Sequence, residues 1–194
     1  DVFSVVPPDE CYNPLHPTTR SDCLQYRGQC LDFIRSTGGV VSSEEPSGWS
    51  VPHLDLVHHG PFALAPDPGR GPAMGIPIPL FNLVYHDALL LPWSLGKGEW
   101  GIPQEDLGYL HGLANGGMPY LSLSPDDQHK KQVHTMCALH KRVALAEMTR
   151  HEFLDGSYRK QRTTFSDGTV VTIDLDADTF DIAPKLTTES QASQ

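Results

Sequence analysis

Acidic side chains stand at or beside the ends of three apolar segments that read as strands. They are Asp1, the neighbours Glu44 and Glu45, and Asp87. Two carboxyl groups about 5–5.5 Å apart allow one to attack a sugar carbon while the other donates a proton, and about 6.5–9.5 Å leaves room for a water instead. The residue types therefore fit the hydrolysis of a glycosidic bond. Solvated loop carboxylates are the alternative, since strands often end in Asp or Glu.

Aromatic and imidazole side chains lie close to these acids in the sequence. The Trp49 ring can pack against the apolar face of a sugar, although a Trp in a loop more often covers the core. His58, His59, His86 and Asp87 can hydrogen-bond sugar hydroxyls. No H-x-x-x-H, H-E-x-x-H or C-x-x-C pattern is present, so we expect no metal site. A metal-dependent hydrolase that uses these histidines remains a competing hypothesis.

The composition excludes several other classes of protein. The chain has 194 residues, 24 acidic and 14 basic side chains and a net charge of −10, which disfavours nucleic acid and anionic membranes as partners. An apolar share of 39% is sufficient for a buried core, and no apolar run is long enough to span a membrane. No nucleophile elbow, P-loop or dinucleotide-binding glycine pattern occurs.

The elements that must position these side chains alternate between strand and helix. We predict a strand over residues 1–6, a helix over 20–36 capped by Thr19, and a strand over 40–43. This order is the β/α unit of a parallel sheet. Further expectations are a strand at 78–85, a helix at 103–114, a strand at 120–124 and a helix at 125–148.

After residue 148 the pattern becomes antiparallel β. Segments 163–165 and 169–175 alternate apolar and polar residues around a turn that contains Asp167 and Gly168. We therefore predict a partial (β/α)8 barrel over residues 1–150, the start of an antiparallel β-sandwich over 151–186 and a disordered tail over 187–194. A complete barrel needs about 250 residues, so we expect the missing half to precede Asp1.

Several of these segments match a known family in order and spacing. The segments Asp1-Val2-Phe3, His16-Pro17-Thr18-Thr19-Arg20, Val40-Val41-Ser42-Ser43-Glu44 and Phe165-Ser166-Asp167-Gly168-Thr169 resemble the α-N-acetylgalactosaminidase group of glycoside hydrolases. The group includes endo-acting mucin-type enzymes and their exo-acting bifidobacterial relatives. The resemblance covers about residues 1–180 and implies the C-terminal part of a catalytic barrel.

The resemblance also implies a role for individual residues. It makes Asp1 the nucleophile and Glu44 the acid/base of a retaining α-glycosidase, with Glu45 as the alternative acid/base. Trp49, His58, His59, His86 and Asp87 are then candidates to line the sugar subsite.

The remaining expectations concern ligands and location. The resemblance implies a carbohydrate substrate, no required cofactor and a calcium ion whose ligands the sequence does not name. A carbohydrate-binding barrel without catalysis is the alternative function. Because the chain begins at Asp rather than Met, we expect it to be an excerpt of a longer chain whose targeting signals lie outside it, which leaves an extracellular or periplasmic location open.

Overall fold

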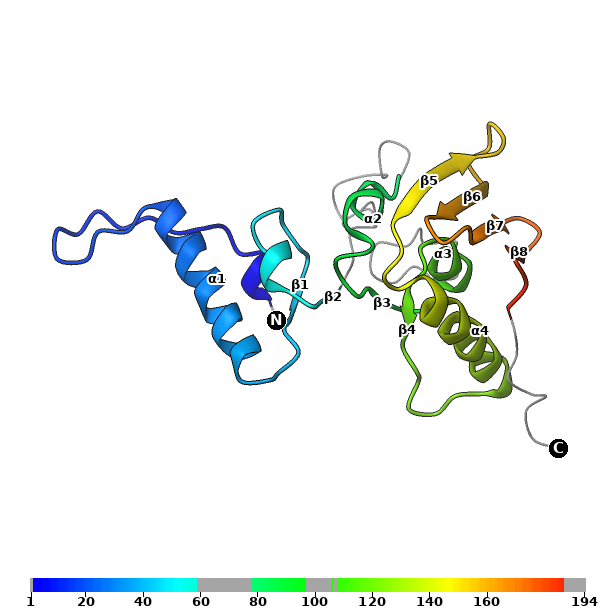
Figure 1. Cartoon of the computed structure of the whole chain (residues 1–194), viewed down its shortest axis with the longest axis horizontal. Coiled ribbons are helices and arrows are strands. Elements are labelled where there is room, and N and C mark those ends of the chain that lie inside the picture. The colour runs from blue at the N-terminus through cyan, green and yellow to red at the C-terminus, as the bar shows by residue number, and fades with distance from the viewer. Residues whose placement is uncertain (1, 59–77, 97–105, 107, 187–194) are drawn as a thin grey trace. The chain divides into compact units, whose positions relative to one another are not determined.

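Two compact units make up the chain, residues 1–58 and residues 59–194 (Figure 1). The computed structural model describes residues 2–58, 78–96, 106 and 108–186. Among these residues no helix has the length and apolar character needed to cross a membrane. The expected disordered tail, 187–194, lies outside the described residues.

The first unit is built on helix α1 (Arg20–Ser36), which is the helix expected from the sequence. Thr19 and Asp22 form a reciprocal capping box, in which each side chain accepts a hydrogen bond from the other's backbone N–H. The helix stops where Gly38 adopts a φ of 85°, a conformation that glycine tolerates without strain.

Two short strands follow α1 and pair in parallel. Strand β1 (Ser42–Glu44) lies beside β2 (Leu56–His58), and a one-turn 3-10 helix, η2 (Val51–His53), lies between them in sequence. Asp55 stabilises this crossover, because its carboxylate accepts hydrogen bonds from the Val41 backbone at 2.8 Å and from the Arg35 side chain at 3.1 Å. The buried apolar residues of this unit are Leu31, Val41, Leu54 and Val57.

The second unit begins with a second parallel strand pair. Helix α2 (Leu80–Tyr85) leads to β3 (Pro92–Trp93), helix α3 (Gly108–Ala114) follows, and β4 (Met118–Pro119) pairs in parallel with β3. Helix α4 (Asp127–Val143) comes next and is capped by the Asp126 side chain, which accepts from the His129 N–H at 2.7 Å.

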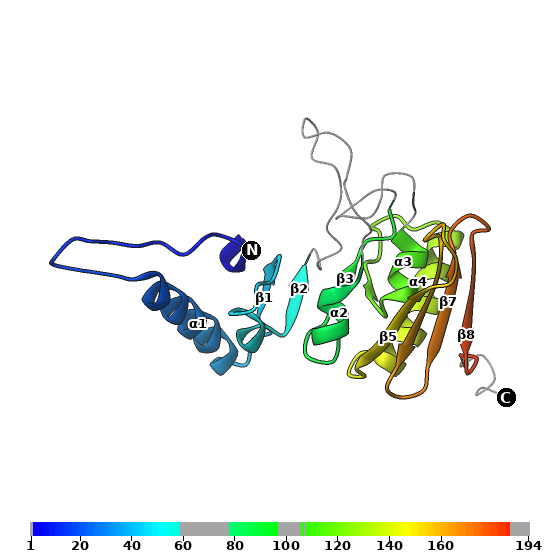
Figure 2. The ribbon, with the colours of Figure 1, turned by 90° about the horizontal axis from the view of Figure 1, so that it is seen from above.

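An antiparallel meander completes this unit. Its order is β5 (Met148–Phe153), β6 (Lys160–Phe165), β7 (Val170–Asp174) and β8 (Thr179–Ala183). Figure 2 shows α3 and α4 along one face of this sheet. That face supplies Phe165, Val171 and Ile173 to a core shared with residues such as Leu113 and Met136. The expected hairpin, and the change to antiparallel strands near residue 150, are thus confirmed.

Three predicted strands are wrong. Residues 1–6 contain a short 3-10 helix, η1 (Val2–Ser4), because Ser4 turns to hydrogen-bond the end of β1. Residues 78–85 contain helix α2, since a short apolar run does not distinguish a strand from a buried helix. The strand expected at 120–124 is a loop that is exposed from residue 121 onwards, and the paired residues precede it in β4.

Candidate active site

The carboxyl ends of β1 and β2 bring two of the candidate residues together. Glu44 is the last residue of β1 and is paired in register with His58, the last residue of β2. Residues paired across a ladder project to the same face, and neighbours along a strand project to opposite faces. Ser43 and Val57, one step earlier, are fully buried. Glu44 and His58 therefore share the opposite face, and both are half-buried.

The segment after Asp1 is hydrogen-bonded to the same strand end. The Ser4 N–H donates to Ser43 Oγ at 3.1 Å, and the two hydroxyl oxygens are 2.8 Å apart. Ser4 Oγ also contacts the backbone oxygen of Glu44. Both serines are buried, so this contact fixes the Val2–Ser4 turn against the strand that carries Glu44. Sequence analysis missed both serines, because no local pattern links positions 39 residues apart.

Glu45 differs from Glu44 in backbone conformation and exposure. It is exposed and has a φ of 45°, which is uncommon outside glycine. Its N–H still donates to the His58 carbonyl oxygen at 3.0 Å, but β1 ends at Glu44 and Glu45 lies in the turn that follows. The two neighbouring acids are thereby separated into a strand residue and a turn residue.

Trp49 lies in the loop that follows the carboxyl end of β1. The loop is held by Ser50, whose hydroxyl donates to the Ser47 carbonyl oxygen at 2.9 Å and accepts from the Ser47 N–H at 3.0 Å. Trp49 is half-buried. Two other candidates, Asp1 and His59, lie outside the described residues.

The structure places His86 and Asp87 differently from the sequence expectation. We expected them to follow a strand, but they follow helix α2. His86 is buried, and its Nε2 lies 3.1 Å from the carbonyl oxygen of Asn115, just ahead of β4. Burial lowers the pKa of His86, although hydrogen bonding to the carbonyl oxygens of Ala146 and Asn115 acts in the other direction. These two residues lie at the amino end of a strand pair, where catalytic groups of β/α folds are not found.

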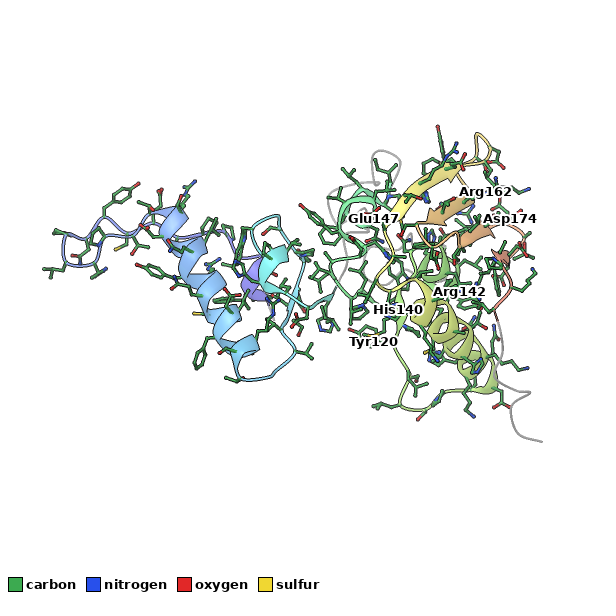
Figure 3. The ribbon with its side chains drawn as sticks, viewed as in Figure 1. Tyr120, His140, Arg142, Glu147, Arg162 and Asp174 are labelled. Atoms are coloured by element: carbon green, nitrogen blue, oxygen red, sulfur yellow. The ribbon has the colours of Figure 1, made fainter. Side chains whose placement is uncertain are left out.

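The carboxyl ends of β3 and β4 carry different side chains. Trp93 is buried in β3, and its Nε1 donates to the Gly108 carbonyl oxygen at 2.8 Å. Tyr120 directly follows β4 and donates its N–H to the Trp93 carbonyl oxygen at 3.0 Å (Figure 3). Burial raises the pKa of the Tyr120 phenol.

One ion cluster, centred on the buried Asp106, was not anticipated. The carboxylate of Asp106 contacts His111 Nε2 and the Arg159 guanidinium, each at 2.9 Å, and Arg159 also contacts Asp176 at 2.7 Å. Burial raises the pKa of Asp106, but the hydrogen bonds from His111 and Arg159 outweigh burial, and the net shift is downward. Arg159 thus connects the residue ahead of α3 to the antiparallel sheet, which is a structural role.

Among the described residues, no group of three or more His, Cys, Asp or Glu side chains could hold a metal ion. The calcium ion implied by the family resemblance stays a prediction, because backbone and amide oxygens can also bind calcium.

Comparison with solved structures identifies the class of protein. The chain matches a quadruple mutant of the α-N-acetylgalactosaminidase NagBb from Bifidobacterium bifidum with 36% identity and a TM-score of 0.83, covering 94% of this chain and 30% of that one. The N-acetylgalactosamine (GalNAc) complex of NagBb matches at 36% identity with a TM-score of 0.81, over the same shares of both chains. No family profile and no curated protein gives a significant match.

These matches show that the chain is related to glycoside hydrolases. More narrowly, its relatives belong to the α-N-acetylgalactosaminidase group, which confirms the resemblance seen in the sequence. The chain spans about a third of the length of the relatives it matches, since it covers 30% of NagBb.

Proposed function

We propose that the chain is the C-terminal part of a (β/α)8 barrel that hydrolyses α-linked N-acetylgalactosaminides with retention of configuration. The antiparallel strands after residue 147 would then begin the following β-domain. Two parallel strand pairs, β1–β2 and β3–β4, support the barrel assignment, because a closed parallel barrel is assembled from such neighbours. The relation to NagBb, which was solved in complex with GalNAc, supports the substrate class.

The observation that carries the proposal is the pairing of Glu44 with His58 at the carboxyl ends of β1 and β2. In β/α barrels this end holds the catalytic groups. The Val2–Ser4 turn is hydrogen-bonded to the same strand end, and Asp1 is the residue that precedes this turn. The segment that follows Asp1 in the sequence and the strand that carries Glu44 therefore meet at one strand end.

The proposed reaction has two steps. The Asp1 carboxylate attacks the anomeric carbon while the bond to the leaving oxygen breaks, and Glu44 donates its proton to that oxygen. Glu44 then removes a proton from water, the water oxygen attacks the same carbon, and the bond to Asp1 breaks. His58, His59 and Trp49 would contact the sugar. His86 and Asp87 are left out, since they follow helix α2 and the His86 ring contacts the backbone ahead of β4.

Single substitutions in the longer protein that carries this chain test the assignment. We expect Asp1→Asn and Glu44→Gln each to lower kcat on an aryl α-N-acetylgalactosaminide by about 10²–10⁴-fold, because each removes a group that bonds to the substrate or transfers a proton. Azide should restore turnover to Glu44→Ala and yield a glycosyl azide of retained configuration.

Glu45→Ala is the matched control, because it removes the neighbouring carboxylate that lies in the turn. Unchanged turnover in Asp1→Asn would show that Asp1 is not the nucleophile. Azide rescue of Glu45→Ala instead of Glu44→Ala would assign the acid/base role to Glu45. Glycan binding by a wild-type protein without hydrolysis would favour a carbohydrate-binding barrel.

A further inference from the structure

A buried pair of serines joins two parts of the first unit that lie 39 positions apart in the sequence. Ser4 is the last residue of the η1 turn, and Ser43 is the middle residue of β1. The exposed fraction is 2% for Ser4 and 1% for Ser43. A hydroxyl removed from water is costly unless it forms hydrogen bonds inside the protein, and those bonds are directional. The pair therefore fixes where the turn lies on the strand.

The contact includes the backbone of Glu44 itself. Ser43 Oγ accepts from the Ser4 N–H at 3.1 Å and lies 2.8 Å from Ser4 Oγ. The Ser4 hydroxyl also contacts the Glu44 carbonyl oxygen and lies 3.4 Å from that of Glu45. Three consecutive residues at the carboxyl end of β1 thus contact one serine.

Arg27 of α1 provides a second anchor for the same segment. Its guanidinium donates to the carbonyl oxygens of Val6 and Pro7, the latter at 3.2 Å, and lies 5.6 Å from the centroid of the Phe3 ring. Only 11% of the Arg27 side chain is exposed, so these contacts are largely shielded from water. The segment that follows Asp1 is therefore held by the helix as well as by the strand.

Strand β1 is supported independently of the serine pair. It is paired with β2 over its three residues, and the Val41 N–H just ahead of it donates to the Asp55 carboxylate at 2.8 Å. Val41 and Val57 are both buried. Loss of the serine contact would therefore release the turn and leave Glu44 in the ladder opposite His58.

The covalent chain limits how far Asp1 can lie from this contact. An extended chain covers at most about 3.6 Å per residue, so the Asp1 Cα stays within about 11 Å of the Ser4 Cα. Retaining hydrolysis requires carboxyl groups about 5–5.5 Å apart, and a displacement of about 1 Å can cost a large factor in rate. A shift of the η1 turn along β1 would change this separation directly.

We propose that Ser4 and Ser43 are positioning residues, which set the place of the nucleophile relative to the acid/base. The inference rests on the proposed function, and it adds two residues that act through Asp1 and Glu44. Stability alone does not require the two hydroxyls, because replacing both partners of a buried hydrogen bond by apolar groups is nearly neutral. Placement of the turn does require them, since an apolar pair has no directional contact.

Alanine substitutions in the longer protein that carries this chain test this role. Ser4→Ala and Ser43→Ala should each lower kcat on 4-nitrophenyl α-N-acetylgalactosaminide about tenfold and change KM less than about twofold, because the sugar contacts remain. The double variant should be no slower than the slower single variant, because both lose the same contact. It should unfold at the same urea concentration as the wild type. Ser21→Ala, at an exposed position of α1, is the matched control and should leave kcat unchanged.

A second substrate separates a displaced nucleophile from a displaced acid. Phenol is a poorer leaving group than 4-nitrophenol, so its departure depends more on protonation. The serine variants should lose equal factors in kcat on the phenyl and 4-nitrophenyl substrates, because Glu44 stays in place. Glu44→Gln should lose a larger factor on the phenyl substrate.

The outcomes distinguish this inference from the proposed function. Unchanged kcat in both serine variants would overturn the positioning role, as would losses that multiply in the double variant. A larger loss on the phenyl substrate would also overturn it, since the acid would then be displaced. So would a loss that disappears when rates are divided by the folded fraction. Full activity of Asp1→Asn and Glu44→Gln would instead refute the proposed function itself.

Discussion

At the scale of the residue, the end of β1 separates two neighbouring glutamates. Glu44 remains in the parallel ladder opposite His58, whereas Glu45 takes a φ of 45°. A left-handed conformation costs a non-glycine residue roughly 1–2 kcal/mol. The hydrogen bond from the Glu45 N–H to the His58 carbonyl oxygen offsets part of this cost. Such strained residues cluster at functional sites, which agrees with the proposed position of the active site.

His151 provides a residue-scale prediction about stability. Its Nδ1 lies 3.0 Å from Thr163 Oγ1, and its Nε2 has no partner within the described chain. Burial lowers the pKa of His151 from 6.5 to about 4. Between these two pH values His151 is protonated in the unfolded chain but stays neutral in the folded chain. The free energy of unfolding should therefore fall as the pH drops from about 6.5 towards 4.

Urea unfolding at pH 7 and pH 5 measures this effect. From pH 7 to pH 5, the free energy of unfolding of the wild-type chain should fall by on the order of 1–2 kcal/mol more than that of His151→Gln. The partial exposure of the ring reduces this difference. His134→Gln on the exposed side of α4 is the matched control. Identical pH dependence in the wild type and His151→Gln would contradict the buried neutral imidazole.

At the scale of the element, close contacts with Trp93 fix the position of α3. A Cβ at Gly112 would lie 2.7 Å from Trp93 Cδ1 and 2.5 Å from Met136 Cε. Met136 has a flexible end, but the Trp93 ring is buried and hydrogen-bonded to Gly108. Only glycine allows the helix to approach the strand this closely.

Gly112→Ala should therefore destabilise the chain. Alanine gains about 1 kcal/mol in helix propensity, and overpacking costs about 1–3 kcal/mol, so we expect a net loss of up to about 2 kcal/mol. Gly156→Ala is the control, because nothing lies within 4 Å of its added Cβ. Chemical denaturation of both variants checks this, and a Gly112→Ala protein as stable as the control would refute the packing argument.

At the scale of the whole molecule, the two units have cores of very different size. The first buries four apolar side chains, those of Leu31, Val41, Leu54 and Val57, among the described residues. The second has a continuous cluster formed by α3, α4 and the antiparallel sheet. Small cores confer little stability, so the first unit should open at a lower free energy.

Hydrogen exchange measured by mass spectrometry tests this difference. In mild denaturant, the amides of α1 should exchange while those of α4, β6 and β7 remain protected. The peptides of each unit serve as internal references for the other. Simultaneous exchange of α1 and α4 at every denaturant concentration would show that the two units unfold together.

Local signals in the sequence determined the elements with strong internal patterns. Thr19, with Asp22 three residues later, defines the start of α1, and the Asp167-Gly168 turn defines the β6–β7 hairpin. These features depend on residues close in sequence, which interact whatever the rest of the chain does. The family resemblance also came from the order of short sequence segments.

The tertiary structure alone decided which side chains meet. Glu44 lies opposite His58 because two strands pair in parallel, and Ser4 reaches Ser43 across 39 positions. His86 and Asp87, expected at the end of a strand, instead follow a helix over residues 80–85, and His86 contacts the backbone ahead of β4. Such contacts join segments distant in the sequence, and no local propensity or spacing encodes them.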